Sequence, residues 1–225
     1  MATQTSDENL LKTINESGFP LQIAVSHLVR SQHPGEWNVR YEEHAWSNVA
    51  TGDSGFIDLV LQNSFDTAYL VVECKRVRDV EWIFLASNGN SMGRRHCKCW
   101  VSRMKNSTLK TFGWHELPVD PQSKEAAFCV VRGQAANGTR PMLERIASEV
   151  VSATEVLATQ ERDFRPSHRN EFFRTYFNLI VTTAPLRVGS FDPSSISIVD
   201  GTLDVAKFET VPYIRFRKQL SEATR

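Results

Sequence analysis

The chain has 225 residues, of which 41% are hydrophobic and 23% charged, and its formal net charge is zero. This composition is typical of a globular protein that buries a real core, and we expect a single domain over residues 1–225. A zero net charge argues against a protein that binds polyanions through its overall charge, such as a histone-like protein. It does not exclude a local basic face. No apolar run approaches the length that crosses a bilayer, so we expect no membrane association.

Two features indicate a cytoplasmic protein. The four cysteines form no visible secretory framework, which favours reduced thiols. The first ten residues also lack the basic segment and apolar run of a signal peptide.

Two helices are expected at the start of the chain. Residues 6–16 place Leu10, Leu11 and Ile14 on one helical face. A second helix begins at Pro20, a residue suited to the first helical position, and ends near residues 33–35. Its core-facing stripe has helical spacing and consists of Leu21, Ala24, Val25, Leu28 and Val29.

Strands are expected next. Residues 37–46 alternate weakly, and residues 56–63 and 68–77 are β-branched runs on either side of a short polar turn, which is the pattern of a hairpin. A further apolar run at 81–86 is expected to extend the same sheet or to pack on its face.

A basic stretch follows, which we expect to be an insertion or long connection over about residues 87–127. No acidic residue occurs between Gly89 and His115. The stretch contains Arg94, Arg95, Lys98, Arg103, Lys105 and Lys110, with Trp100, Phe112 and Trp114 interleaved. Basic and aromatic side chains together favour contact with nucleic-acid phosphates and bases, while an ordinary solvated loop remains the alternative.

The second half begins with a short strand at 128–131 and the clearest helix of the chain, at 141–160, whose apolar residues repeat at helical spacing. A buried-type strand follows at 176–183. The glycine- and proline-rich remainder is expected to hold shorter strands at residues 186–188, 196–199 and 211–216.

Three charged residues lie inside the apolar hairpin: Asp58 in the first strand, and Glu73 and Lys75 in the second. Strand side chains alternate between faces, so Glu73 and Lys75 point the same way and Cys74 points oppositely. If Asp58 lies across from this pair, two carboxylates and an ammonium converge. Paired carboxylates among apolar residues are costly without a cation, so we expect a divalent metal, with a solvated edge-strand salt bridge as the alternative. Such oxygen ligands suit Mg²⁺ or Mn²⁺.

The series helix, three strands, helix and strand, with Ile57–Asp58 on the second strand and Glu73–Cys74–Lys75 on the third, resembles the PD-(D/E)XK, or restriction-endonuclease-like, nuclease superfamily. The helix opener at residues 18–22 is also similar. The resemblance implies a mixed α/β fold with an αβββαβ core over about residues 18–184, a mixed central sheet flanked by helices, and a β-rich extension over about 185–220.

The resemblance also implies site residues. Asp58, Glu73 and the main-chain carbonyl of Cys74 would hold the metal, and Lys75 would be catalytic. Members often carry a metal-supporting Glu on the first core helix, where this chain has Gln22. An amide brings an oxygen but no charge, and the sequence leaves open whether Glu16, Glu42 or Glu43 supplies the missing carboxylate.

The implied activity is hydrolysis of phosphodiester bonds by an Mg²⁺- or Mn²⁺-dependent nuclease. DNA is favoured over RNA as the substrate, and defence against foreign DNA is a role by analogy with the family. A nuclease-fold module that binds nucleic acid or a protein without turnover is the alternative. A homodimer and a regulatory partner protein are also left open by the resemblance.

Overall fold

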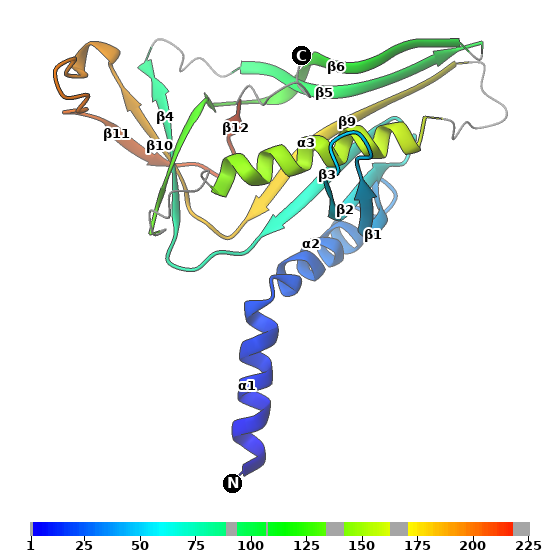
Figure 1. The fold of residues 1–225 in the computed structure, drawn as a ribbon, viewed down its shortest axis with the longest axis horizontal. Coiled ribbons are helices and arrows are strands. Elements are labelled where there is room, and N and C mark those ends of the chain that lie inside the picture. Colours follow the sequence, from blue (N-terminus) through cyan, green and yellow to red (C-terminus); the bar gives the residue numbers. More distant parts are fainter. Residues whose placement is uncertain (1, 89–93, 107, 134–141, 163–170, 218–225) are drawn as a thin grey trace. The chain divides into compact units, whose positions relative to one another are not determined.

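The computed structural model describes residues 2–88, 94–106, 108–133, 142–162 and 171–217, with the side chains of residues 2–5, 94 and 95 excepted. Its elements are drawn in Figure 1 and are α1 (Ala2–Glu16), α2 (Phe19–Gln32), β1 (Trp37–Ser47), β2 (Ser54–Asn63), β3 (Ala68–Lys75), β4 (Glu81–Ser87), β5 (Arg94–Lys105), β6 (Thr108–Ser123), β7 (Glu125–Ala126), β8 (Phe128–Arg132), α3 (Met142–Gln160), β9 (Glu171–Thr182), β10 (Leu186–Phe191), η2 (Pro193–Ser195), β11 (Lys207–Thr210) and β12 (Arg215–Phe216).

The chain divides into two compact units. The first comprises Met1–Arg76, Cys99–Gly113 and Glu149–Thr182, and the second comprises Val77–Lys98, Trp114–Ser148 and Thr183–Arg225. The division falls within β5, β6 and α3. None of the described helices combines the length and the apolar character that crossing a membrane requires.

The first unit is organised by a six-stranded mixed sheet in the order β1-β2-β3-β9-β5-β6. The meander β1-β2-β3 is antiparallel, β9 joins β3 in parallel, and β5 pairs with β9 antiparallel. A parallel neighbour needs a crossover connection, and α3 lies in the connection that precedes β9. The expectation of a mixed α/β fold is thereby confirmed.

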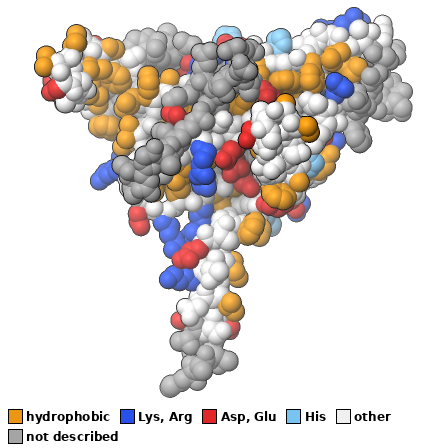
Figure 2. All heavy atoms as spheres, viewed as in Figure 1, with side chains coloured by type: hydrophobic (Ala, Val, Ile, Leu, Met, Phe, Trp, Pro, Cys, Tyr) orange, Lys and Arg blue, Asp and Glu red, His pale blue; other side chains and the backbone are white. Residues whose placement is uncertain are grey.

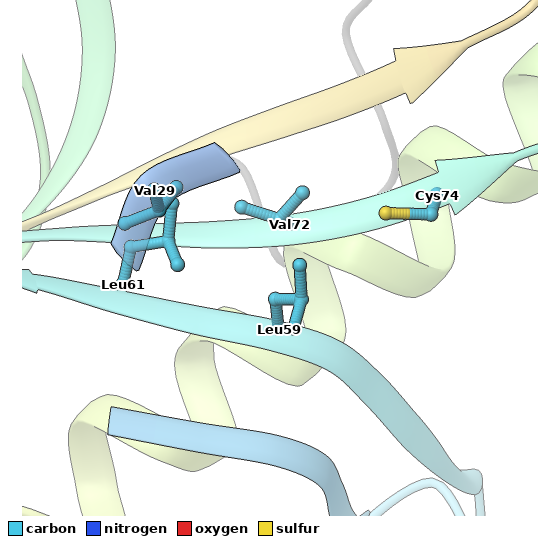
Figure 3. Close-up of a cluster of buried hydrophobic side chains, with 5 residues drawn as sticks. All are labelled: Val29, Leu59, Leu61, Val72 and Cys74. Carbon is cyan, nitrogen blue, oxygen red and sulfur yellow. The ribbon is translucent and has the colours of Figure 1, made fainter. Parts of the chain in front are cut away.

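Helix α2 covers one face of this sheet. Val29 of α2 packs with Leu59 and Leu61 of β2 and with Val72 and Cys74 of β3 (Figure 3). Residues two apart on a strand share a face, which explains why alternate positions of β2 and β3 form this cluster. The Cys74 thiol therefore lies on the α2 side, opposite to its neighbours Glu73 and Lys75, as the alternation predicted.

Helix α3 lies on the other face of the sheet. Thr154 of α3 is fully buried, and its hydroxyl donates to Oδ1 of Asn178 in β9 at 2.6 Å. Asn178 pairs with Val71 of β3, so the face that carries Val71 and Glu73 is the one beneath α3. The N-terminal helix prediction was short by four residues, because α1 already begins at Ala2.

The structure refines three sequence predictions. Strand β4 does not extend the first sheet but belongs to a second sheet, in the order β11-β10-β4-β8. The basic stretch, expected as an insertion or long connection, contains two long strands, because β5 and β6 continue the six-stranded sheet. In the C-terminal part, residues 196–199 form only an isolated bridge from Ile196 to Leu203, and Ile198 and Val199 are almost fully exposed. β-branched residues without a packing surface do not hold a strand.

A buried ionic network ties the end of α3 to the sheet. Glu161 is only 4% exposed. Its Oε1 accepts from Nε of Arg40 at 2.8 Å, and its Oε2 accepts from Nη1 of Arg174 at 3.1 Å and from the Tyr176 hydroxyl at 3.0 Å. Arg174 also contacts Oδ2 of Asp66 through Nη2 at 2.9 Å. Each charge in the network therefore has an opposite partner, which burial demands.

We predict that Glu161→Gln lowers the free energy of unfolding by about 3–5 kcal/mol, because it leaves the buried guanidinium of Arg174 and the partly buried one of Arg40 short of a counter-charge. Urea denaturation followed by circular dichroism measures this loss. The matched control is Glu171→Gln, which removes an exposed carboxylate bound to Arg103 and should cause no comparable loss. Equal effects of the two substitutions would contradict a structural role for the buried network.

Candidate active site at the fork between two strands

The predicted residues Asp58, Glu73 and Lys75 lie together on the α3 face of the sheet. Leu59 of β2 pairs with Val72 of β3 in an antiparallel register, so the next position along each strand sets Asp58 opposite Glu73. Lys75 follows two residues later, on the same face as Glu73. The convergence that the sequence predicted conditionally is therefore present.

Strands β2 and β3 stop pairing at this point and form a fork. The ladder between them ends at Leu59 and Val72, although β2 remains paired with β1 and β3 with β9. The side chain of Asp58 takes the place of the missing ladder bond, because its Oδ2 accepts from the Cys74 amide at 2.6 Å. This bond fixes the carboxylate at the mouth of the fork. The metal-binding role of the Cys74 carbonyl stays a prediction.

Gln22 also reaches the fork. It lies in the first turns of α2, is 7% exposed, and its Nε2 donates to the main-chain oxygen of Asp58 at 2.8 Å. The amide thus holds the backbone of the residue that carries the carboxylate. A glutamate could not donate this hydrogen bond when ionised, which gives a local reason for glutamine at this position.

Of the three candidates for a further carboxylate, Glu43 lies nearest to the fork in the register. Glu42 pairs with Leu59 and His44 with Ile57, so Glu43 of β1 falls opposite Asp58. Its φ of 51° is unusual for a strand residue. Glu42 is directed instead to the α2 face, where its Oε1 accepts from Ser26 and from Arg30. Glu16 is the last residue of α1.

Sequence reasoning missed Glu149 of α3, an exposed residue whose charge acts on Glu73. A signal was available, because Glu149 stands three residues after Ile146 and four before Ala153, both of which are buried. That spacing puts an acidic side chain at the margin of the buried stripe of the helix.

The site holds more negative than positive charge. Burial, followed by repulsion from Asp58, raises the pKa of Glu73 to about 7. Lys75 opposes this rise, and Glu149 and Glu43 add smaller repulsions. Burial also raises the pKa of Asp58, with the Cys74 amide and Lys75 opposing and Glu43 adding. Figure 2 shows acidic side chains gathered on the drawn face, close to where β3 and α3 lie in Figure 1.

These donors fit a hard divalent cation. No group of three or more His, Cys, Asp or Glu side chains suited to holding a metal occurs in the described part of the chain. Mg²⁺, however, usually keeps several waters and takes only one or two carboxylates from a protein, and here Asp58 and Glu73 face each other with raised pKa values. A cation at this place would relieve the repulsion that raises them.

Three of the five predicted nucleic-acid-binding side chains lie within the described residues, and those of Arg94 and Arg95 do not. Lys98 and Lys105 of β5 are both exposed. Arg103 already binds Glu171 through Nε at 2.8 Å and Nη2 at 2.6 Å.

Comparisons with protein-family models, curated proteins and solved structures found no match to this chain. The family resemblance therefore rests on the residues at the fork and on the order of the elements around it.

We predict that Glu73→Gln stabilises the metal-free protein at about pH 8 but leaves its stability at about pH 5 nearly unchanged. The pKa of Glu73 is near 7 in the folded protein and 4.5 ordinarily. Between these values the folded state keeps a proton that the unfolded state has released, so the wild-type protein loses stability as the pH rises through this window. The glutamine variant lacks that titration.

The measurement is the melting temperature at both pH values in EDTA. Glu8→Gln on α1 serves as the control, because Glu8 is exposed and distant in sequence from the fork, and it should leave the pH dependence unchanged. If the glutamine variant of Glu73 loses as much stability with rising pH as the wild type, the pKa of this carboxyl is not raised by burial and by the neighbouring charges.

Proposed function

We propose that this chain is a metal-dependent nuclease that hydrolyses phosphodiester bonds, with DNA as the favoured substrate and Mg²⁺ or Mn²⁺ as the cofactor. The observation that carries the proposal is the fork itself: Asp58 and Glu73 face each other where β2 and β3 part, and Lys75 follows on the same face. This is the placement that the resemblance to PD-(D/E)XK nucleases requires of its three motif residues.

The order of elements also supports a restriction-endonuclease-like core. Helix α2, the antiparallel meander β1-β2-β3, helix α3 and the parallel strand β9 occur in the αβββαβ order, with β4 to β8 between β3 and α3. Helices α2 and α3 pack on opposite faces of the sheet. In this proposal, β5 and β6 are additions to that core on the far side of β9.

The chain's own residues would divide the chemistry as follows. Asp58 and Glu73 would hold the ion, which when bound would polarise a phosphoryl oxygen and lower the pKa of a water molecule. Lys75 would orient the attacking water and stabilise negative charge that develops on the phosphate. Gln22 would keep Asp58 in place through its main-chain oxygen. Glu73 must lose its proton before it can bind a cation, so binding should strengthen as the pH rises through about 7.

A second candidate function is a binding module with the same fold and little or no turnover. Two observations favour it: Gln22 brings no charge, and the described residues offer no set of three ligating side chains. Both weaken metal affinity without disturbing the fold. Turnover by the purified protein separates the two candidates.

We predict that Lys75→Ala reduces the cleavage rate by about 10²–10⁴-fold while leaving the fold and Mn²⁺ binding intact, because the ammonium acts on the reacting groups and is not a ligand. The assay incubates plasmid, linear duplex, single-stranded DNA and RNA with Mg²⁺ or Mn²⁺, and calorimetry measures Mn²⁺ binding. Asp58→Asn should lose both cleavage and Mn²⁺ binding, since Asp58 is proposed as a ligand.

Lys12→Ala on the exposed helix α1 is the matched control and should cleave at the wild-type rate. Cleavage by Lys75→Ala at that same rate, or products that form equally well in EDTA, would end the nuclease proposal. Metal-independent binding of an oligonucleotide without products under any condition would favour the binding module.

A further inference from the structure

Among the described residues, one face of the four-stranded sheet in the second unit carries exposed side chains. Strand β8 alternates, with Phe128, Val130 and Arg132 exposed on one face. On the opposite face the large aromatic residues Trp82 and Phe84 of β4 are buried. One face of this sheet is therefore buried and the other exposed, as in an ordinary half-buried sheet, but the exposed face is not polar. We call this outer face of β11-β10-β4-β8 the open face.

The register arranges the open face in rows that cross the strands. One row runs from Phe128 of β8 through Leu85 of β4 and Gly189 of β10 to Phe208 of β11. Phe128 is 65% exposed and Phe208 is 58% exposed. Three strand spacings, about 14 Å in all, separate the two ends of the row. The two exposed phenylalanine residues therefore lie at either end of the surface formed by Leu85 and Gly189, which we call the apolar floor.

Gly189 makes room for one of the rings. A Cβ atom at this position would lie 2.9 Å from Cε1 of Phe208 and 3.6 Å from Cδ2 of Leu85. The ring of Phe208 therefore lies across the β10 backbone toward the middle of the sheet. Any larger residue would displace it, so the glycine sets the position of this aromatic side chain on the open face.

The neighbouring rows carry positive charge. The next row holds Val130, Ile83 and Arg187, and Arg132 and Glu81 form a third. Arg132 and Arg187 each contact the same carboxylate, that of Glu81, at 3.1 Å. Two arginines share one acidic side chain, so this group of three side chains carries a net charge of plus one.

We infer that the open face binds single-stranded nucleic acid, with bases stacked on Phe128 and Phe208 and phosphates beside Arg132 and Arg187. Exposed aromatic rings on a sheet can stack on the bases of a single strand, and basic side chains next to the rings can bind its phosphates. This inference deepens the proposed function by naming the form of the substrate, and it depends on that function only in assuming a nucleic-acid ligand.

Charge argues against a second copy of the chain on this face. If two open faces met, the arginine pair of one copy would lie either on the apolar floor of the other or against its arginines. Both arrangements bury two arginines that share a single carboxylate, that of Glu81, which is unfavourable. A single-stranded nucleic acid can place its bases on the apolar floor and its phosphates beside the arginines at the same time.

The test measures fluorescence anisotropy of a labelled oligothymidylate, about 20 nucleotides long, and of a matching duplex, with the full chain in EDTA so that no cleavage occurs. We expect the single strand to bind more tightly than the duplex. Phe128→Leu and Phe208→Leu should each weaken single-strand binding by about fivefold or more, because leucine keeps the apolar surface but not the stacking. Phe128→Tyr, which keeps the ring, should bind like the wild type.

Phe65→Ala is the matched control, since Phe65 is a 73% exposed phenylalanine in the turn between β2 and β3, and it should leave binding unchanged. Thermal melts check that each variant is folded. Leucine variants that are folded and bind the single strand as tightly as the wild type would overturn the inference. So would preferential duplex binding, or self-association in ultracentrifugation that is lost in both leucine variants. This test measures binding in EDTA, whereas the nuclease proposal is tested by metal-dependent cleavage, so failure here and failure of the nuclease proposal are distinguishable.

Discussion

The hydrogen bond from the Cys74 amide to the carboxylate of Asp58 is the interaction on which the candidate site depends. It replaces a rung of the β2–β3 ladder, and it therefore both ends the pairing and fixes a charged group where the strands part. Gln22 holds the same residue from the other side, through its main-chain oxygen. A charged side chain in an apolar hairpin is costly, and here that cost is offset by main-chain and amide partners rather than by solvent alone.

The same fork collects more negative charge than its single lysine balances. Glu43 and Glu149 approach from β1 and α3, and each adds to the repulsion that raises the pKa of Glu73. A purely structural salt bridge would be arranged to cancel charge, as the buried network around Glu161 does at another part of the same sheet. This contrast within one unit supports the proposal that the fork binds a cation, whether or not turnover follows.

Sequence patterns predicted the inner part of the first unit well and the second unit poorly. Period-two alternation placed Glu73 and Lys75 on one face and Cys74 on the other. The apolar stripe predicted for α2 identified Val29 as core, but its members Ala24 and Leu28 are exposed. The register that sets Asp58 opposite Glu73 could only be stated conditionally, because it depends on which rung ends the ladder. Strand β5 was missed because its many charged residues obscure the pattern of the buried Val101 and Met104. The sheet to which β4 belongs was missed because its partner, β10, lies about a hundred residues away in the sequence. Neither feature has a local signal.

The position of α3 links the two charged regions of the first unit. Its Glu149 acts on Glu73, while Glu161, just beyond its last turn, is held by Arg40 and Arg174. Twelve residues of helix, about 18 Å, separate the two glutamates, and Thr154 is bound to Asn178 between them. Because a helix anchored at its end and middle has little freedom to slide, the buried network also sets where Glu149 meets the fork. The charge balance of the site is therefore a property of the packed unit and not of its three motif residues alone.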